Sequence, residues 1–190
     1  MKYIFDFDDV LFNNTAQFKE HAFRVIAKVG VPLDYVKEYY SEIRKQDSEF
    51  SLKDFIATLF ERYNVIIDEE KVYESIMSEC SKFINVPLVE WVKKIGKDNC
   101  YIVSNGNEYF QHNKIKDSGL APLFDEIFIV PGSKKEIIYD ICDKNKNEKV
   151  IFIDNRNRFF KDLDFKKCPN LKTILYTGQN VESLLEEINK

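Results

Sequence analysis

The fold is decided by residues 3–11, which read YIFDFDDVL. The run Tyr3–Phe7 is short and rich in Ile, Phe and Tyr, which predicts a strand that is buried on both faces. Asp6, Asp8 and Asp9 gather at its C-terminal end. Because three carboxylates beside a buried strand repel one another, this placement indicates a functional site rather than an acidic turn.

Four more apolar runs of the same kind follow: Cys100–Val103, Glu126–Val130, Val150–Ile153 and Lys172–Tyr176. Helical patterns of apolar residues lie between and after them, as in Lys134–Lys144 and Val181–Asn189. Alternation of buried strands and helices is typical of a parallel sheet covered on both faces. The sequence therefore predicts an α/β fold with a doubly wound, parallel, five-stranded, Rossmann-like sheet.

The segment between the first two strands differs from the rest, because residues 15–97 show helical periodicity alone. Ser51-x-x-Asp54 predicts one helix start, and Asp68 predicts another as an N-cap. The many aromatic side chains of this segment indicate core packing, since they lie largely at helical spacing. We therefore expect an α/β core at 1–14 and 98–190, with an inserted all-helical cap at 15–97.

Composition narrows the class of protein. The chain has 190 residues, of which 44% are hydrophobic and 32% charged, so it is neither disordered nor of low complexity. A net charge of −4 gives no overall attraction to nucleic acid or to an anionic membrane. Apolar runs stay below the ~18 residues of a membrane span, and MKYIFDFDDV lacks the pattern of a signal peptide. Four widely spaced cysteines match no zinc or disulfide pattern, so we expect a cytoplasmic protein.

Polar groups follow the C-terminal ends of four predicted strands, where open α/β sheets bind their ligands. Beyond Asp6 and Asp8, the second strand leads into Ser104-Asn105-Gly106, and the third leads into Lys134 at a helix start. The fourth ends at Asp154. Carboxylate oxygens suit Mg²⁺, whereas a lysine and a hydroxyl near a helix N-terminus suit a phosphoryl group. Four strand ends thus predict a site for a metal and a phosphate.

These motifs resemble, in order, those of the haloacid dehalogenase-like (HAD) superfamily: DFDDVL, the strand ending in SNG, the helix start at Lys134, and FIDN. Gly119-Leu120 and Phe124-Asp125 are similar to the run that usually follows the second motif. The helical segment after the first strand resembles the cap of the phosphatase-type members. The resemblance covers most of the chain and implies a Mg²⁺-dependent phosphatase acting on a small phosphorylated metabolite.

The resemblance also implies a role for each matched residue. Asp6 would be the nucleophile, and Asp8 the general acid and base. Ser104 and the Asn105 backbone would bind the phosphoryl group, together with Lys134. Mg²⁺ would be held by Asp6, Asp154 and the main-chain carbonyl of Asp8. We prefer Lys134 to Lys135, since it stands three residues before Ile137, the first apolar residue of the helix.

The fourth motif departs from the family, which usually has a second acid where this chain has Asn155, Arg158 or Phe159. The departure keeps open a HAD-like protein that has lost turnover and serves in binding or regulation. A phosphotransferase or mutase also stays open. Dehalogenation is disfavoured, because dehalogenases lack a carboxylate at the place of Asp8. A receiver domain would carry its phosphorylated aspartate on a later strand, without a helical insertion.

Other polar residues of the chain enter no predicted site. His21 and His112 have no matched partner, which is more typical of surface or half-buried histidines than of metal ligands. Arg24, Arg44 and Lys45 fall on the predicted cap helices. A substrate entrance and a solvated face are the alternatives for them, and we favour the solvated face.

Overall fold

The computed structural model describes residues 1–45 and 50–190. Its strands form one parallel sheet in the order β3-β2-β1-β4-β5. The strands are β1 (Lys2–Phe5), β2 (Cys100–Asn105), β3 (Glu126–Val130), β4 (Val150–Asp154) and β5 (Leu171–Leu175). The predicted α/β class, the five parallel strands and the helical insertion after the first strand are confirmed.

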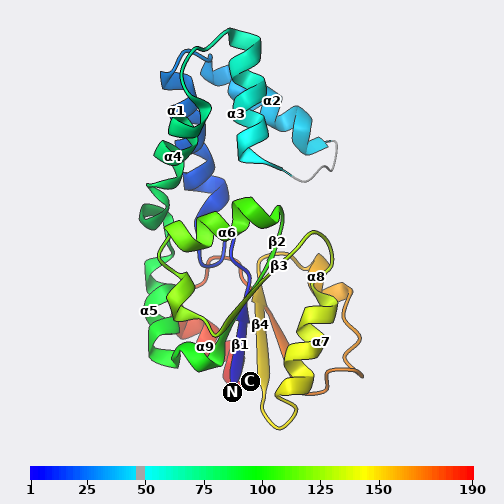
Figure 1. Ribbon diagram of the computed structural model, residues 1–190. Coiled ribbons are helices and arrows are strands. Elements are labelled where there is room, and N and C mark those ends of the chain that lie inside the picture. The colour runs from blue at the N-terminus through cyan, green and yellow to red at the C-terminus, as the bar shows by residue number, and fades with distance from the viewer. Residues whose placement is uncertain (46–49) are drawn as a thin grey trace.

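Helices cover both faces of the sheet (Figure 1). One layer contains α5 (Val86–Ile95) and α9 (Val181–Asn189), and the opposite layer contains α7 (Lys135–Lys144) and α8 (Arg158–Lys161). Side chains alternate along each strand, so Phe5 packs into the first layer and Ile4 into the second. Helix α6 (Glu108–Asp117) follows β2 and lies between the sheet and the cap (Figure 1).

The cap helices stand beyond one end of the sheet (Figure 1). They are α1 (Lys19–Lys28), α2 (Leu33–Lys45), α3 (Leu52–Tyr63) and α4 (Glu69–Met77). The predicted N-caps are confirmed: the Ser51 side chain accepts a hydrogen bond from Asp54 N, and the Asp68 side chain accepts one from Glu70 N. Aromatic stacking joins the helices, as between Tyr39 and Phe55, whose ring centroids are 5.6 Å apart.

Helix α5 belongs by its packing to the sheet, although it lies inside the segment 15–97. The Trp91 ring lies edge-on to Tyr3 and Phe5 of β1, with centroid distances of 5.3 and 5.8 Å. Its neighbours across the layer are on α9. The division of the chain at residues 14/15 and 97/98 stays a prediction, and this packing favours a cap that ends before α5.

Strand β1 ends at Phe5, two residues before its predicted end at Phe7. The reason is a tight loop, in which the Phe7 carbonyl accepts hydrogen bonds from Leu11 N and Phe12 N, both at 3.0 Å. Asp9 takes a positive φ of 60° within this loop. Asp6 therefore directly precedes this loop, whereas Asp8 lies within it.

Two short segments connect cap and core: η1 (Asn14–Phe18, a π-helix turn) and η2 (Cys80–Phe83, a 3₁₀ turn). Asn13, the residue before η1, donates a backbone hydrogen bond of 2.7 Å from its N–H to Phe83 O of η2. Two further 3₁₀ turns, η3 (Lys97–Asn99) and η4 (Ala121–Leu123), precede β2 and β3. None of the helices in the described ranges combines the length and hydropathy that a membrane span needs.

Candidate active site

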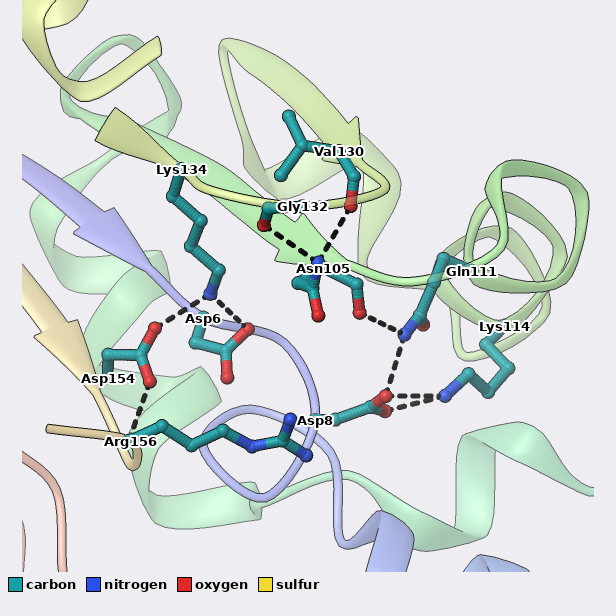
Figure 2. A network of polar contacts seen from close by, with 10 residues as sticks. All are labelled: Asp6, Asp8, Asn105, Gln111, Lys114, Val130, Gly132, Lys134, Asp154 and Arg156. Atoms are coloured by element: carbon teal, nitrogen blue, oxygen red, sulfur yellow. Dashed lines mark hydrogen bonds and ion pairs between the residues drawn. The ribbon is translucent and has the colours of Figure 1, made fainter. Parts of the chain in front are cut away.

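The strand ends bring Asp6, Lys134 and Asp154 into direct contact (Figure 2). Asp6 follows β1, and its backbone N–H donates to Ile153 O at 2.9 Å, which ties it to β4. Asp154 is the last residue of β4, and Lys134 directly precedes α7. Because the strands are parallel, their C-terminal ends share one edge, as the sequence predicts.

Lys134 lies at the centre of this group. Its Nζ donates to Asp6 Oδ1 and to Asp154 Oδ2, each at 2.7 Å, and all three side chains are buried. The Phe159 ring packs beneath the ammonium at 4.5 Å from Nζ to centroid. Lys135, the alternative in the sequence, is exposed. One ammonium between two carboxylates leaves a buried group with one net negative charge.

Burial raises the pKa of Asp6 to about 6. The Lys134 ammonium opposes this increase, while the Asp154 carboxylate adds to it. A raised pKa means that the site destabilises the ionised form of Asp6, which fits the excess of negative charge. A cation bound here would relieve that excess.

The donor set at the strand ends fits a hard cation. Asp6 and Asp154 supply carboxylate oxygens, and the next residue, Asn155, has a buried Oδ1 without a hydrogen-bond partner among the described residues. Oxygen ligands of this kind are those that Mg²⁺ prefers. Within residues 1–45 and 50–190, no three His, Cys, Asp or Glu side chains form a metal cluster by themselves. A metal would therefore also need the amide oxygen, main-chain carbonyls or water.

Ser104 stands fully buried at the end of β2, and its Oγ also has no partner in the described part of the chain. A buried hydroxyl without a partner costs about 1–3 kcal/mol, so its placement calls for a ligand or a water molecule. This observation agrees with the predicted phosphate-binding role of Ser104.

The Asn105 side chain has a structural role, which differs from the phosphate contact predicted for its backbone. Its Nδ2 donates to Val130 O at 3.1 Å and to Gly132 O at 2.9 Å, so the amide holds the loop after β3 against β2 (Figure 2). The predicted phosphate contact assigned to Asn105 uses its backbone and stays a prediction. Gly106 follows with a φ of +149°, and a Cβ there would come within 3.0 Å of Gln111 Nε2.

Asp8 is separated from the pair Asp6–Asp154 and has partners that the sequence analysis did not identify (Figure 2). Lys114 Nζ lies 2.6 and 2.9 Å from its two carboxylate oxygens, and Gln111 Nε2 lies 2.7 Å from Oδ2. Both partners are on α6. Contact between a metal and the Asp8 carbonyl stays a prediction.

Lys114 is a buried cation whose side chain is only 1% exposed. Four aromatic rings have centroids within 6.0 Å of its Nζ: Phe7, Phe12, Phe18 and Phe110. The rings add cation–π attraction, but Asp8 is the counter-ion of this pocket. The signal in the sequence is a lysine three residues after Gln111 and four after Phe110, on a helical face that is otherwise buried.

Replacing Lys114 with methionine should lower the free energy of unfolding by at least about 2 kcal/mol, because Asp8 would lose its buried counter-ion. Lys116→Met is the matched control, since Lys116 is exposed on the same helix and should change stability by less than about 0.5 kcal/mol. Urea unfolding of both variants measures the difference. Equal stability of the two variants would contradict the role of Lys114 as the partner of Asp8.

A cavity of about 550 Å³ opens between the cap and the strand ends. Core residues of its wall include Asp8, Asn105 and Lys114, and cap residues include Tyr40 and Arg44 of α2. Arg44 is exposed, as the favoured interpretation has it, and it also lines the cavity, which is the substrate-entrance alternative. Two further arginines that the sequence analysis did not place in a site also line the cavity: Arg156, in the loop after β4, and Arg158, the first residue of α8.

Solved structures with the same architecture identify the fold. YfnB of Bacillus subtilis, assigned as a HAD-hydrolase and solved bound to magnesium, is 18% identical over 100% of this chain and 98% of its own, with a TM-score of 0.59. A Burkholderia xenovorans protein assigned as a haloacid dehalogenase-like hydrolase is 15% identical over 91% and 80%, with a TM-score of 0.67. A Thermotoga maritima protein assigned as a β-phosphoglucomutase is 18% identical over 98% and 91%, with a TM-score of 0.55.

No protein-family model and no curated protein matches the sequence. At these identities the solved structures establish the fold alone. The chain thus has the HAD-like hydrolase fold, with a helical cap inserted after β1.

Proposed function

We propose that the protein is a Mg²⁺-dependent phosphatase that hydrolyses a small phosphomonoester through an aspartyl-phosphate on Asp6. The observation that carries this proposal is the buried group Asp6–Lys134–Asp154, with one ammonium between two carboxylates at the strand ends. A carboxylate needs such compensation to approach a phosphate dianion, since two anions in a dry site repel strongly.

In the proposed reaction, a carboxylate oxygen of Asp6 forms a bond to phosphorus while the bond to the leaving oxygen breaks. Asp8 gives a proton to that leaving oxygen and then takes a proton from the water that attacks the phosphorus of the intermediate. Inorganic phosphate leaves, and Asp6 returns to its free carboxylate. The present partners of Asp8, Lys114 and Gln111, stabilise the carboxylate that the second step requires.

The remaining residues bind and orient the phosphoryl group. Lys134 neutralises charge on Asp6 and on the phosphoryl oxygens, and the unpartnered hydroxyl of Ser104 donates a hydrogen bond to one of them. Asp6, Asp154 and Asn155 would hold the metal, which supplies positive charge beside the phosphoryl oxygens when it is bound. The magnesium in the YfnB structure supports this choice of ion.

A second candidate is a HAD-like binding or regulatory protein without turnover. It is favoured by Asn155, which stands where the family usually has an acid, and by the ion pair that holds Asp8. Calorimetry with Mg²⁺ and beryllium fluoride separates the candidates. Tight, metal-dependent capture of this phosphoryl mimic supports a competent site, and its absence favours the second candidate.

Release of inorganic phosphate from a panel of sugar phosphates, nucleotides and 4-nitrophenyl phosphate tests the phosphatase directly. We expect phosphate release with Mg²⁺ from at least one compound. The rate of release should decrease at least about 100-fold after addition of EDTA, because the positive charge of the metal beside Asp6 would be lost. Transfer of phosphate to a second substrate molecule instead of water would identify a phosphotransferase or mutase. A protein inert toward the whole panel would contradict the phosphatase.

A further inference from the structure

The wall of the cavity has a charge opposite to that of the chain. Its basic side chains are Arg44, Lys114, Arg156 and Arg158, and its acidic ones are Asp8 and Asp162. The cavity therefore has a formal charge of +2 (four basic minus two acidic groups), whereas the whole chain has −4. Lys114 is matched by Asp8, so the excess belongs to the arginines.

The three guanidinium groups have no acidic partner within the described part of the chain, which covers residues 1–45 and 50–190. Arg158 packs on the Phe159 ring, at 4.7 Å from its central carbon to the centroid. Arg156 extends from the end of β4 past Asp154 toward Asp8 (Figure 2). Guanidinium groups suit carboxylates and phosphates, because their planar N–H fork matches two anionic oxygens.

The arginines come from both sides of the cavity. Arg44 is on cap helix α2, while Arg156 and Arg158 follow β4 in the core. Tyr40, one helical turn before Arg44, also lines the cavity. Burial raises the pKa of the Tyr40 hydroxyl. The charges of Arg44 and Arg156 lower this pKa, and the charge of Asp8 raises it. Tyr40 therefore shares one electrostatic environment with both arginines and with Asp8.

The cavity is larger than a phosphate group requires. Its volume of about 550 Å³ falls within the range of small-molecule sites, so it has room for the rest of a substrate beside the phosphoryl group. We propose that this rest carries a second anionic group, a carboxylate or another phosphate, which Arg44, Arg156 and Arg158 bind. The proposal rests on the proposed function, since it takes the reacting phosphate to lie at Asp6.

Three compounds with the same carbon chain test the proposal: propyl phosphate, 3-(phosphonooxy)propanoate and propane-1,3-diyl bisphosphate. Their affinities for Asp6→Asn are measured by calorimetry with Mg²⁺, and their hydrolysis by the wild-type protein is followed in parallel. We expect at least one doubly anionic compound to bind at least tenfold more tightly than propyl phosphate. The doubly anionic compound with the higher affinity shows whether the second anionic group is a carboxylate or a phosphate.

Variants of the three arginines test whether these residues cause the preference for doubly anionic compounds. Arg156→Gln, Arg158→Gln and Arg44→Gln should each reduce the preference at least threefold, and the triple variant should abolish it. Arg24→Gln is the control, because Arg24 is exposed on α1 and outside the cavity. It should leave the preference unchanged.

Equal affinity for the three compounds, no binding of either doubly anionic compound, or a preference that survives the triple variant would overturn the proposal. Preferential binding would support the anion site even if neither these compounds nor any member of the phosphate-release panel were hydrolysed, a result that would contradict the phosphatase. Hydrolysis without preferential binding of a doubly anionic compound would support the phosphatase and contradict the anion site.

Discussion

Replacing Asp6 with asparagine should abolish phosphate release, by about 10³-fold or more, without destabilising the fold. The amide cannot form the aspartyl-phosphate, which accounts for the loss of activity. Stability should stay equal or rise, because the substitution removes one of two carboxylates that share the single ammonium of Lys134.

The gain in stability should depend on pH in metal-free protein. Folded Asp6 keeps its proton up to a pKa of about 6, whereas its ordinary value is 3.8, so ionised Asp6 opposes folding. The wild-type protein therefore loses up to roughly 3 kcal/mol as pH rises from about 4 through about 6. Asp6→Asn lacks this loss, so its advantage should be present above about pH 6 and absent below about pH 4.

Urea unfolding with EDTA at several pH values measures this dependence. Asp143→Asn serves as the control, since Asp143 is exposed on α7 and should affect neither activity nor stability. Full activity of Asp6→Asn would contradict the proposed nucleophile. A loss of several kcal/mol in this variant would contradict the excess of negative charge at the site.

Replacing Lys134 with methionine should have the opposite effect on stability. Asp6 and Asp154 would remain buried within one site and without a cation, so the free energy of unfolding should fall by about 3–5 kcal/mol. Phosphate release should also be lost, because Asp6 would approach the phosphoryl group without the positive charge of Lys134, which contacts both carboxylates. Thermal and urea unfolding of metal-free protein measure the change.

Lys135→Met is the matched control for this prediction. Its side chain is exposed, so stability should change by less than about 0.5 kcal/mol. The double variant Asp6→Asn/Lys134→Met should recover part of the lost stability, since one buried charge is then removed. A larger effect of Lys135→Met than of Lys134→Met would show that the assignment of the two lysines is reversed.

The sheet and the strand-end residues could be predicted because each depends on local pattern. Continuous apolar runs locate buried strands, and parallel strands must place their C-terminal ends, with Asp6, Ser104 and Asp154, along one edge. The strand boundary at Phe5 could not be predicted, since it depends on the hydrogen bonds that the Phe7 carbonyl accepts from the loop.

The partners of Asp8 and the arginines of the cavity depend on tertiary packing instead. Lys114 occupies a position of α6 that normally holds an apolar residue, and its charge is tolerated because Asp8 lies opposite. Arg44 faces the site because of the way the cap lies over the core, which helical periodicity cannot specify. Local sequence patterns therefore do not identify residues of this kind.

The proposed mechanism requires that Asp6 carries the phosphoryl group during turnover. The most direct measurement uses the best substrate of the phosphate-release panel, labelled with ³²P, and rapid acid quench over the first turnover. We expect a transient label on the peptide containing Asp6. Hydroxylamine should remove it, as expected for an acyl phosphate, and Asp6→Asn should lack it. Turnover with no protein-bound label, or with the label on another side chain, would contradict the proposed mechanism.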